Sequence, residues 1–127
     1  MTPLEPWLRN GYDIHVVFQP EQQAAARAMM DAFLAFVDSR SIPYERPILF
    51  EEPVGPWTTP MWQVLLQQPD PEGLSRSLGD CVGWLMANHG PFSVMVHPNS
   101  VDGGRIDHTE HAFWLGRPTP LKLEIFS

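Results

Sequence analysis

The chain has 127 residues, of which 43% are hydrophobic and 18% charged, a balance typical of globular proteins and unlike that of disordered ones. A chain of this length is expected to form one domain, residues 1–127, with a hydrophobic core that needs no disulfide bonds. The net charge of −7 opposes binding to phosphate backbones, so we expect no nucleic-acid partner.

The cellular location is predicted from what the sequence lacks. No apolar run approaches the roughly 20 residues that a membrane-spanning helix needs. Residues 1–10 contain two prolines, a glutamate and an arginine, which is unlike a secretory signal. The single cysteine, Cys81, excludes an intrachain disulfide and a cysteine-based zinc site. We therefore expect a cytoplasmic protein with no membrane partner.

The first predicted element is a strand over residues 12–19, which are rich in aromatic and β-branched side chains. Pro20 suits the first position of a helix, which we expect to end in the proline-containing stretch 39–47. The apolar residues of this helix recur at helical spacing and are Ala25, Met29, Phe33, Phe36 and Val37. Strands are predicted next over residues 48–52 and 61–68.

A second helix is predicted over residues 72–88, because Gly90 and Pro91 follow it as glycine and proline commonly follow a helix. A fourth strand is predicted over residues 92–97. The tail, residues 105–127, is expected to contain a short helical turn near residues 109–115.

This order of elements predicts an α+β fold of the ferredoxin-like βαββαβ type, with a C-terminal tail. In that plan a four-stranded antiparallel sheet carries both helices on one face, and the first strand lies between the third and the fourth. The other face is too apolar to be left in water. The tail, a second subunit or both would cover it, and we expect a homodimer with the sheets packed face to face.

Two histidines are predicted to point from this second face of the sheet. Side chains alternate along a strand, so His15 lies opposite to Ile14 and Val16, and His97 lies opposite to Val96. If the more apolar rows face the helices, both imidazoles project from neighbouring strands and can share an ion or a substrate. The alternative is two half-buried histidines with structural roles.

Further candidates come from the turns and the tryptophans. His108 and His111 lie in D-H-T-E-H and would share a face of a helical turn, although a solvated polar turn is the alternative. Trp57 and Trp62 are candidate walls of an apolar pocket for an aromatic ligand, and core packing is the alternative. His89, at a helix C-terminus, is interpreted as structural.

Several segments, spread over nearly the whole chain and in the same order, resemble the DOPA 4,5-dioxygenase family. These segments are G-Y-D-I-H-V-V-F (11–18), P-V-G-P (53–56), M-W-Q-V (61–64), S-V-M-V-H-P (93–98), D-H-T-E-H-A-F-W-L-G (107–116) and P-L-K-L (120–123). The fourth and fifth are the more specific of the set.

The resemblance implies a ferredoxin-like dimer and an oxidoreductase that opens the ring of a catechol-like substrate such as DOPA. Dioxygen would be inserted beside the two hydroxyls at non-haem iron(II), the implied cofactor. His15, His97 and His108 match the family's histidines, which makes them the expected metal ligands and catalytic residues. We place Trp57, Trp62 and His111 at the substrate.

The chain also departs from the family pattern. Phe50, Trp57 and Thr58 occupy positions where the family commonly has two histidines and a proline, and His89 stands where arginine is frequent. The expected site is therefore more apolar. Either a metal site is built from the three matched histidines with a carboxylate or His111, or the chain is a non-catalytic relative that binds a small aromatic ligand at a dimer interface. A dimeric scaffold without a ligand is the third alternative.

Overall fold

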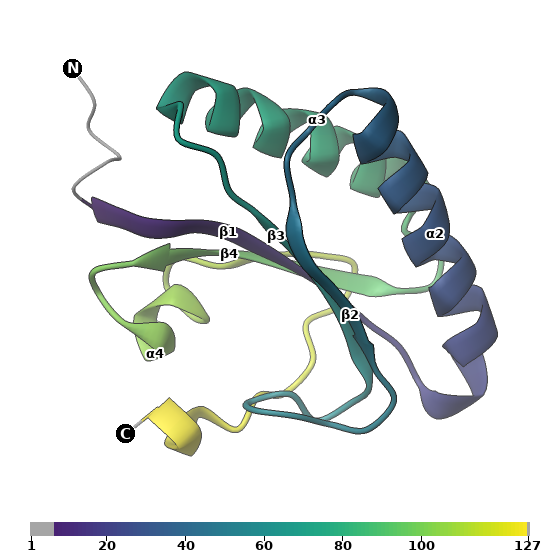
Figure 1. Cartoon of the computed structure of the whole chain (residues 1–127). Helices are drawn as coiled ribbons and strands as arrows, with labels where there is room; N and C mark the ends of the chain where they lie inside the picture. The colour runs from purple at the N-terminus through teal and green to yellow at the C-terminus, as the bar shows by residue number, and fades with distance from the viewer. Residues whose placement is uncertain (1–6, 127) are drawn as a thin grey trace.

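The computed structural model describes residues 7–126, which form one antiparallel sheet with helices on both sides (Figure 1). The strands are β1 (Leu8–Val17), β2 (Glu45–Phe50), β3 (Met61–Leu66), β4 (Ser93–Ser100) and β5 (Phe113–Leu115). The helices are α2 (Gln23–Ser39), α3 (Pro71–Asn88) and α4 (Gly104–Asp107), with 3-10 turns η1 (Pro20–Gln22) and η2 (Leu123–Phe126).

The sheet has the strand order β2-β3-β1-β4-β5, and all of its pairs are antiparallel. The prediction that the first strand lies between the third and the fourth is confirmed. The sheet has five strands among the described residues where the sequence predicted four. Residues 113–115 pair with 94–96 instead of forming the expected helical turn, because the turn forms earlier, at α4.

The main core lies between the sheet and the two long helices, which Figure 1 shows together on one side. Ile14 and Val16 of β1 are fully buried there against Phe33 of α2 and Leu85 of α3. These helical residues recur at helical spacing, so one stripe of each helix packs on the sheet. The stripe predicted for the first helix is confirmed in part: Met29, Phe33 and Val37 are buried and Phe36 is half-buried. Ala25 is exposed, and Ala26 and Met30 are buried instead.

A bulge lengthens β1 beyond the predicted strand. The strand begins at Leu8, and its register against β4 shifts between Leu8 and Tyr12. Gly11 adopts a φ of 63° there, and a Cβ atom at this position would overlap the carbonyl oxygen of Leu66. Glycine is therefore required at the bulge.

The second face of the sheet is covered by the chain itself. Trp57, in the loop after β2, forms an isolated bridge with Leu121 of the tail, and the Lys122 amide donates to the Pro56 carbonyl at 2.8 Å. Beneath them, Met61 and Met95 are buried in a second, smaller core. The tail thus packs on its own sheet, and the homodimer stays a prediction.

No helix within residues 7–126 is long and apolar enough to cross a membrane.

Candidate metal centre

Three histidines meet under the loop and the tail. His15 comes from β1, His97 from β4, and His108 follows α4. The Nε2 atoms of His15 and His97 lie 3.0 Å apart. With His108, each ring offers one nitrogen, and these three atoms all lie within 4.8 Å of one another. His15 and His97 are 4% and 2% exposed, and His108 is half-buried.

The sheet register explains why the two strand histidines meet. His97 lies opposite Asp13, and His15 lies opposite Met95, so the two imidazoles are diagonal neighbours on one face. Diagonal neighbours on adjacent strands are within reach of large side chains. Their rings stack with centroids 5.0 Å apart. The alternation argument thus placed both rings on the correct face.

Hydrogen bonds to backbone carbonyls determine which nitrogens face inward. Nδ1 of His97 lies 2.9 Å from the Pro98 oxygen, and Nδ1 of His108 lies 2.7 Å from the Gly104 oxygen. A carbonyl only accepts, so both Nδ1 atoms carry the proton and both Nε2 atoms keep a lone pair. His15 Nε2 then donates to His97, which leaves the buried Nδ1 of His15 without a partner.

Burial keeps the imidazoles of His15 and His108 neutral. It is the largest cause that lowers the pKa of His15 well below its usual value, and the neighbouring His97 and His108 lower it further. Burial, followed by His97, lowers the pKa of His108 to about 4, although the Gly104 carbonyl and Asp107 act in the opposite direction. Neutral imidazole is the form that ligates a metal ion, so the cluster is ready to bind one at neutral pH.

Aromatic rings flank the histidines. Trp57 is 2% exposed, and its ring centroid lies 4.4 Å from that of His15. Phe126, from η2, lies 4.8 Å from His108. Phe50 packs against the same small core as Trp57. Trp57 therefore contributes apolar surface next to His15, and Phe50 adds to the small core that supports this indole.

The Dopa 4,5-dioxygenase family matches residues 12–125, which include all three histidines. The chain belongs to this family.

Two relatives agree with the assignment. An uncharacterized 21.2 kDa protein of Botryotinia fuckeliana is 35% identical over 133 residues, which cover 97% of this chain and 67% of that protein. A crystal structure from Nostoc punctiforme, of a protein provisionally named a dioxygenase, has 28% identity and a TM-score of 0.68. The match covers 91% of this chain and 90% of that one. The resemblance stated from the sequence is thus confirmed.

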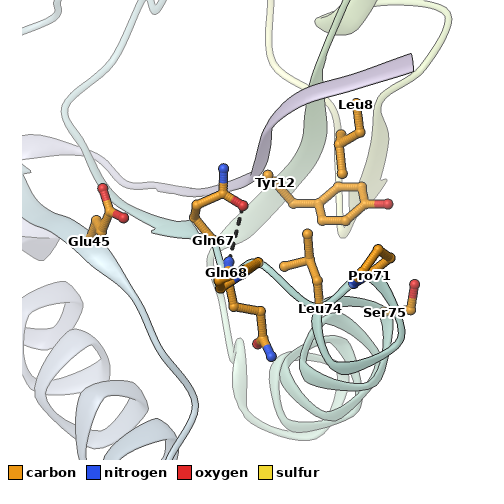
Figure 2. Close-up of a pocket in the computed structure, with 10 residues that line it drawn as sticks. Leu8, Tyr12, Glu45, Gln67, Gln68, Pro71, Leu74 and Ser75 are labelled. Atoms are coloured by element: carbon orange, nitrogen blue, oxygen red, sulfur yellow. Dashed lines mark hydrogen bonds between the residues drawn. The ribbon is translucent and has the colours of Figure 1, made fainter. Parts of the chain in front are cut away.

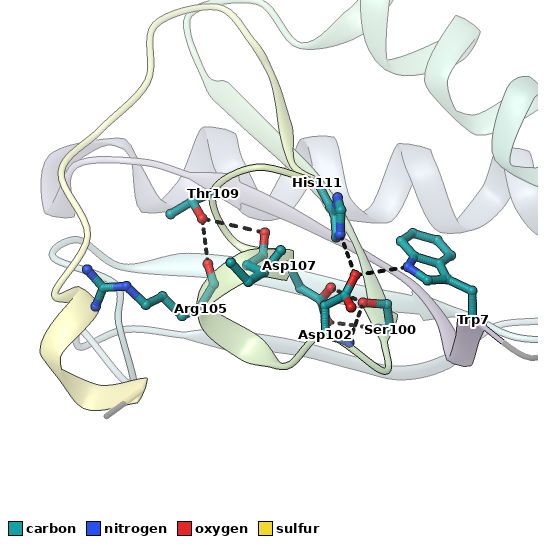
Figure 3. Close-up of polar contacts among 8 residues, drawn as sticks. Trp7, Ser100, Asp102, Arg105, Asp107, Thr109 and His111 are labelled. Atoms are coloured by element: carbon teal, nitrogen blue, oxygen red, sulfur yellow. Dashed lines mark hydrogen bonds and ion pairs between the residues drawn. The ribbon is translucent and has the colours of Figure 1, made fainter.

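Two residues that the sequence assigned to the substrate lie away from the cluster. Trp62 is fully buried on the helix side, with its ring 5.6 Å from that of Phe33, because its position opposite Val16 turns it away from the histidines. Nε2 of His111 lies 2.8 Å from Asp102, on the partly exposed side of the loop (Figure 3). Neither side chain lines the three-histidine cluster.

Sequence reasoning missed two residues that do contact it. Asp13 Oδ2 lies 3.9 Å from His97 Nε2. The same oxygen accepts a hydrogen bond from the side-chain amide of Asn99 at 2.9 Å. Strand alternation could have found Asp13, because it lies two residues before His15 on the same face. Phe126 had no local signal, because only the path of the tail brings it to His108.

A separate cavity of about 530 Å³ opens at one end of the sheet. Figure 2 shows the Tyr12 ring in its wall, close to Leu8 and Leu74. Tyr12 and Leu74 pack with the main core, between the sheet and the two long helices, so this cavity lies across the sheet from the histidines. It is therefore not part of the three-histidine cluster.

Proposed function

We propose that the protein is a metal-dependent dioxygenase that opens the ring of a catechol-like aromatic compound, such as DOPA, by extradiol cleavage. His15, His97 and His108 would hold an iron(II) ion. The observation that carries the proposal is the convergence of three imidazoles, each of which offers one nitrogen within 4.8 Å of the other two. Membership of the Dopa 4,5-dioxygenase family supports the reaction class.

The donor set suits a divalent transition metal. Two nitrogens at about 2.1 Å from one ion and at a right angle would lie about 3.0 Å apart, and the His15 and His97 Nε2 atoms are separated by 3.0 Å. Metal binding would require His15 to carry its proton on Nδ1, the atom that has no partner in the present arrangement. When bound, iron(II) would supply open positions for the two catechol oxygens and dioxygen.

The other residues would bind and orient the substrate. Trp57 and Phe126 present aromatic surfaces on two sides of the cluster and keep water away from it. Asp13 is placed to accept a hydroxyl proton, because its carboxylate lies beside His97 and is held by Asn99. This assignment gives the proton-accepting role to a carboxylate in a site where Phe50 and Trp57 replace family histidines.

The assembly is part of the same proposal. We propose that β1 to β4 with α2 and α3 form a ferredoxin-like unit, and the sheet order that places β5 at the edge beside β4 is compatible with this. Phe113 on this edge is 41% exposed. We propose a cytoplasmic homodimer, the state that the family resemblance implies.

Oxygen consumption tests the function. Metal-free protein is reloaded with iron(II) and mixed with DOPA or catechol, and dioxygen uptake is followed with an electrode. We expect uptake by the unaltered protein and at least a 100-fold loss in His15→Ala and in His97→Ala. His89→Ala is the matched control, because the His89 side chain bonds the Phe92 carbonyl, outside the cluster. This variant should retain full activity.

Two other results would replace the proposal. Binding of the aromatic compound without metal and without oxygen uptake would favour the non-catalytic relative. If neither metal nor aromatic compound binds, the dimeric scaffold is the better description.

A further inference from the structure

Beyond the ligands themselves, we infer that Asp107 is a positioning residue that holds His97 and His108 at the spacing a shared metal ion needs. It would do so by clamping the end of β4 through Ser100. The inference rests on the proposed metal-binding function, but it assigns a role to a side chain that would not contact the ion.

Asp107 makes an unusually complete contact with a single partner. Its carboxylate is 3% exposed, and both of its oxygens accept hydrogen bonds from Ser100 (Figure 3). The Ser100 amide donates to Oδ2 at 2.8 Å, and the Ser100 hydroxyl donates to Oδ1 at 2.5 Å. A charge-assisted contact at two points fixes orientation as well as distance.

The clamp joins the chain segments that carry two of the three histidines. Ser100 lies three residues after His97 in β4, and Asp107 directly precedes His108. The two hydrogen bonds therefore close the loop between the histidines at both of its ends. The His97 and His108 ring centroids lie 3.9 Å apart, so a small rotation of the backbone near Asp107 would change this spacing directly.

Contacts within the α4 turn couple the position of Asp107 to the orientation of the His108 imidazole. Gly104 accepts hydrogen bonds from both the backbone amide and the Nδ1 atom of His108, at 2.9 and 2.7 Å. The Asp107 amide donates to the Gly103 carbonyl at 3.0 Å. Once Asp107 is fixed on β4, the ring of His108 is thus fixed too, with Nε2 toward the other histidines.

Anchoring of the loop alone does not account for Asp107. The same loop is already tied to the start of β1 by Asp102, which accepts from Trp7 Nε1 at 3.0 Å and contacts His111 Nε2 at 2.8 Å. Asp102 does this at the surface, whereas a buried carboxylate costs desolvation free energy. Groups that orient metal ligands are commonly buried and hydrogen-bonded in this way.

Cobalt(II) alone is the probe for the test, because its binding can be measured without turnover. Metal-free protein is titrated calorimetrically, and the absorption spectrum of the cobalt site is recorded. We expect Asp107→Asn to weaken cobalt binding by about 10- to 100-fold and to alter the spectrum. Ser100→Ala should weaken it in the same direction, and Ser100→Thr, which keeps the hydroxyl, should restore most of the affinity.

The matched control is Asp102→Asn, the same substitution on the same loop. It should leave cobalt affinity within about 2-fold of the unaltered protein, even if it lowers the melting temperature. Circular dichroism verifies folding, and if Asp107→Asn does not fold, the two Ser100 variants decide the question.

The outcomes separate the two claims. Cobalt binding by the unaltered protein that is unchanged in Asp107→Asn, or equally weakened in Asp102→Asn, would overturn the positioning role and leave the metal site intact. A failure of the unaltered protein to bind cobalt would overturn both.

Discussion

Replacing Trp57 by alanine tests how the loop after β2 closes the histidine cluster. The indole is 2% exposed and packs in the small core with Val17, Met61 and Met95. Removal of a buried Trp side chain typically costs about 3–5 kcal/mol of unfolding free energy. Much of the loop 51–60 is exposed and can relax into the space, so we expect about 3 kcal/mol. That loss is a large part of a typical total of about 5–15 kcal/mol.

Urea unfolding of the metal-free protein measures this cost, provided that the slope of the transition is unchanged. Trp57→Phe should cost about 1 kcal/mol, because it keeps an apolar ring. Trp84→Ala is the control for loss of an indole elsewhere. Trp84 is half-buried on α3 against Phe36, so we expect about 1–2 kcal/mol.

A second measurement on the same variant reports on the cluster itself. Burial is the largest cause of the lowered pKa of His15, and Trp57 supplies part of that burial. In Trp57→Ala the His15 pKa, followed by NMR, should rise toward its ordinary value. An unfolding free energy within about 1 kcal/mol of the unaltered protein, with no change at His15, would refute the role given to this loop.

Three further expectations concern backbone, acid and assembly. Gly11→Ala should lower the free energy of unfolding, measured with urea, by more than about 2 kcal/mol. Gly55 also has a positive φ but lies in open space, so Gly55→Ala should lower it by about 1 kcal/mol. Equal losses in the two variants would contradict the clash with Leu66. The metal-free protein should lose stability as pH falls from about 6.5 toward 4. In this range the histidines of the unfolded chain bind protons, whereas His15 and His108 stay neutral in the folded protein. A urea midpoint that does not change with pH would contradict this. Sedimentation equilibrium should give the mass of a dimer, and a monomer at micromolar concentration would refute the homodimer.

Strand periodicity explains how much of the site could be predicted. It repeats every two residues, so His15 and His97 could be placed on one face from their immediate neighbours alone. For β3 it gave no such answer, because all six of its residues are buried and both faces are apolar. Only the pairing with β1 places Trp62 on the helix side.

The turn after β4 was harder to predict. Helical spacing suggested that His108 and His111 share a face, but α4 ends at Asp107, so the two rings point to different partners. The path of the tail, which brings Phe126 onto His108, depends on contacts between segments far apart in the chain. Long-range packing of this kind has no local pattern in the sequence.

The most direct test of the metal centre is a crystal grown with cobalt(II), with anomalous diffraction recorded at the cobalt edge. The proposal requires one anomalous peak within bonding distance of His15, His97 and His108, and its loss in His97→Ala. A protein that crystallises with cobalt and shows no peak among these rings, or a peak only elsewhere, would contradict it.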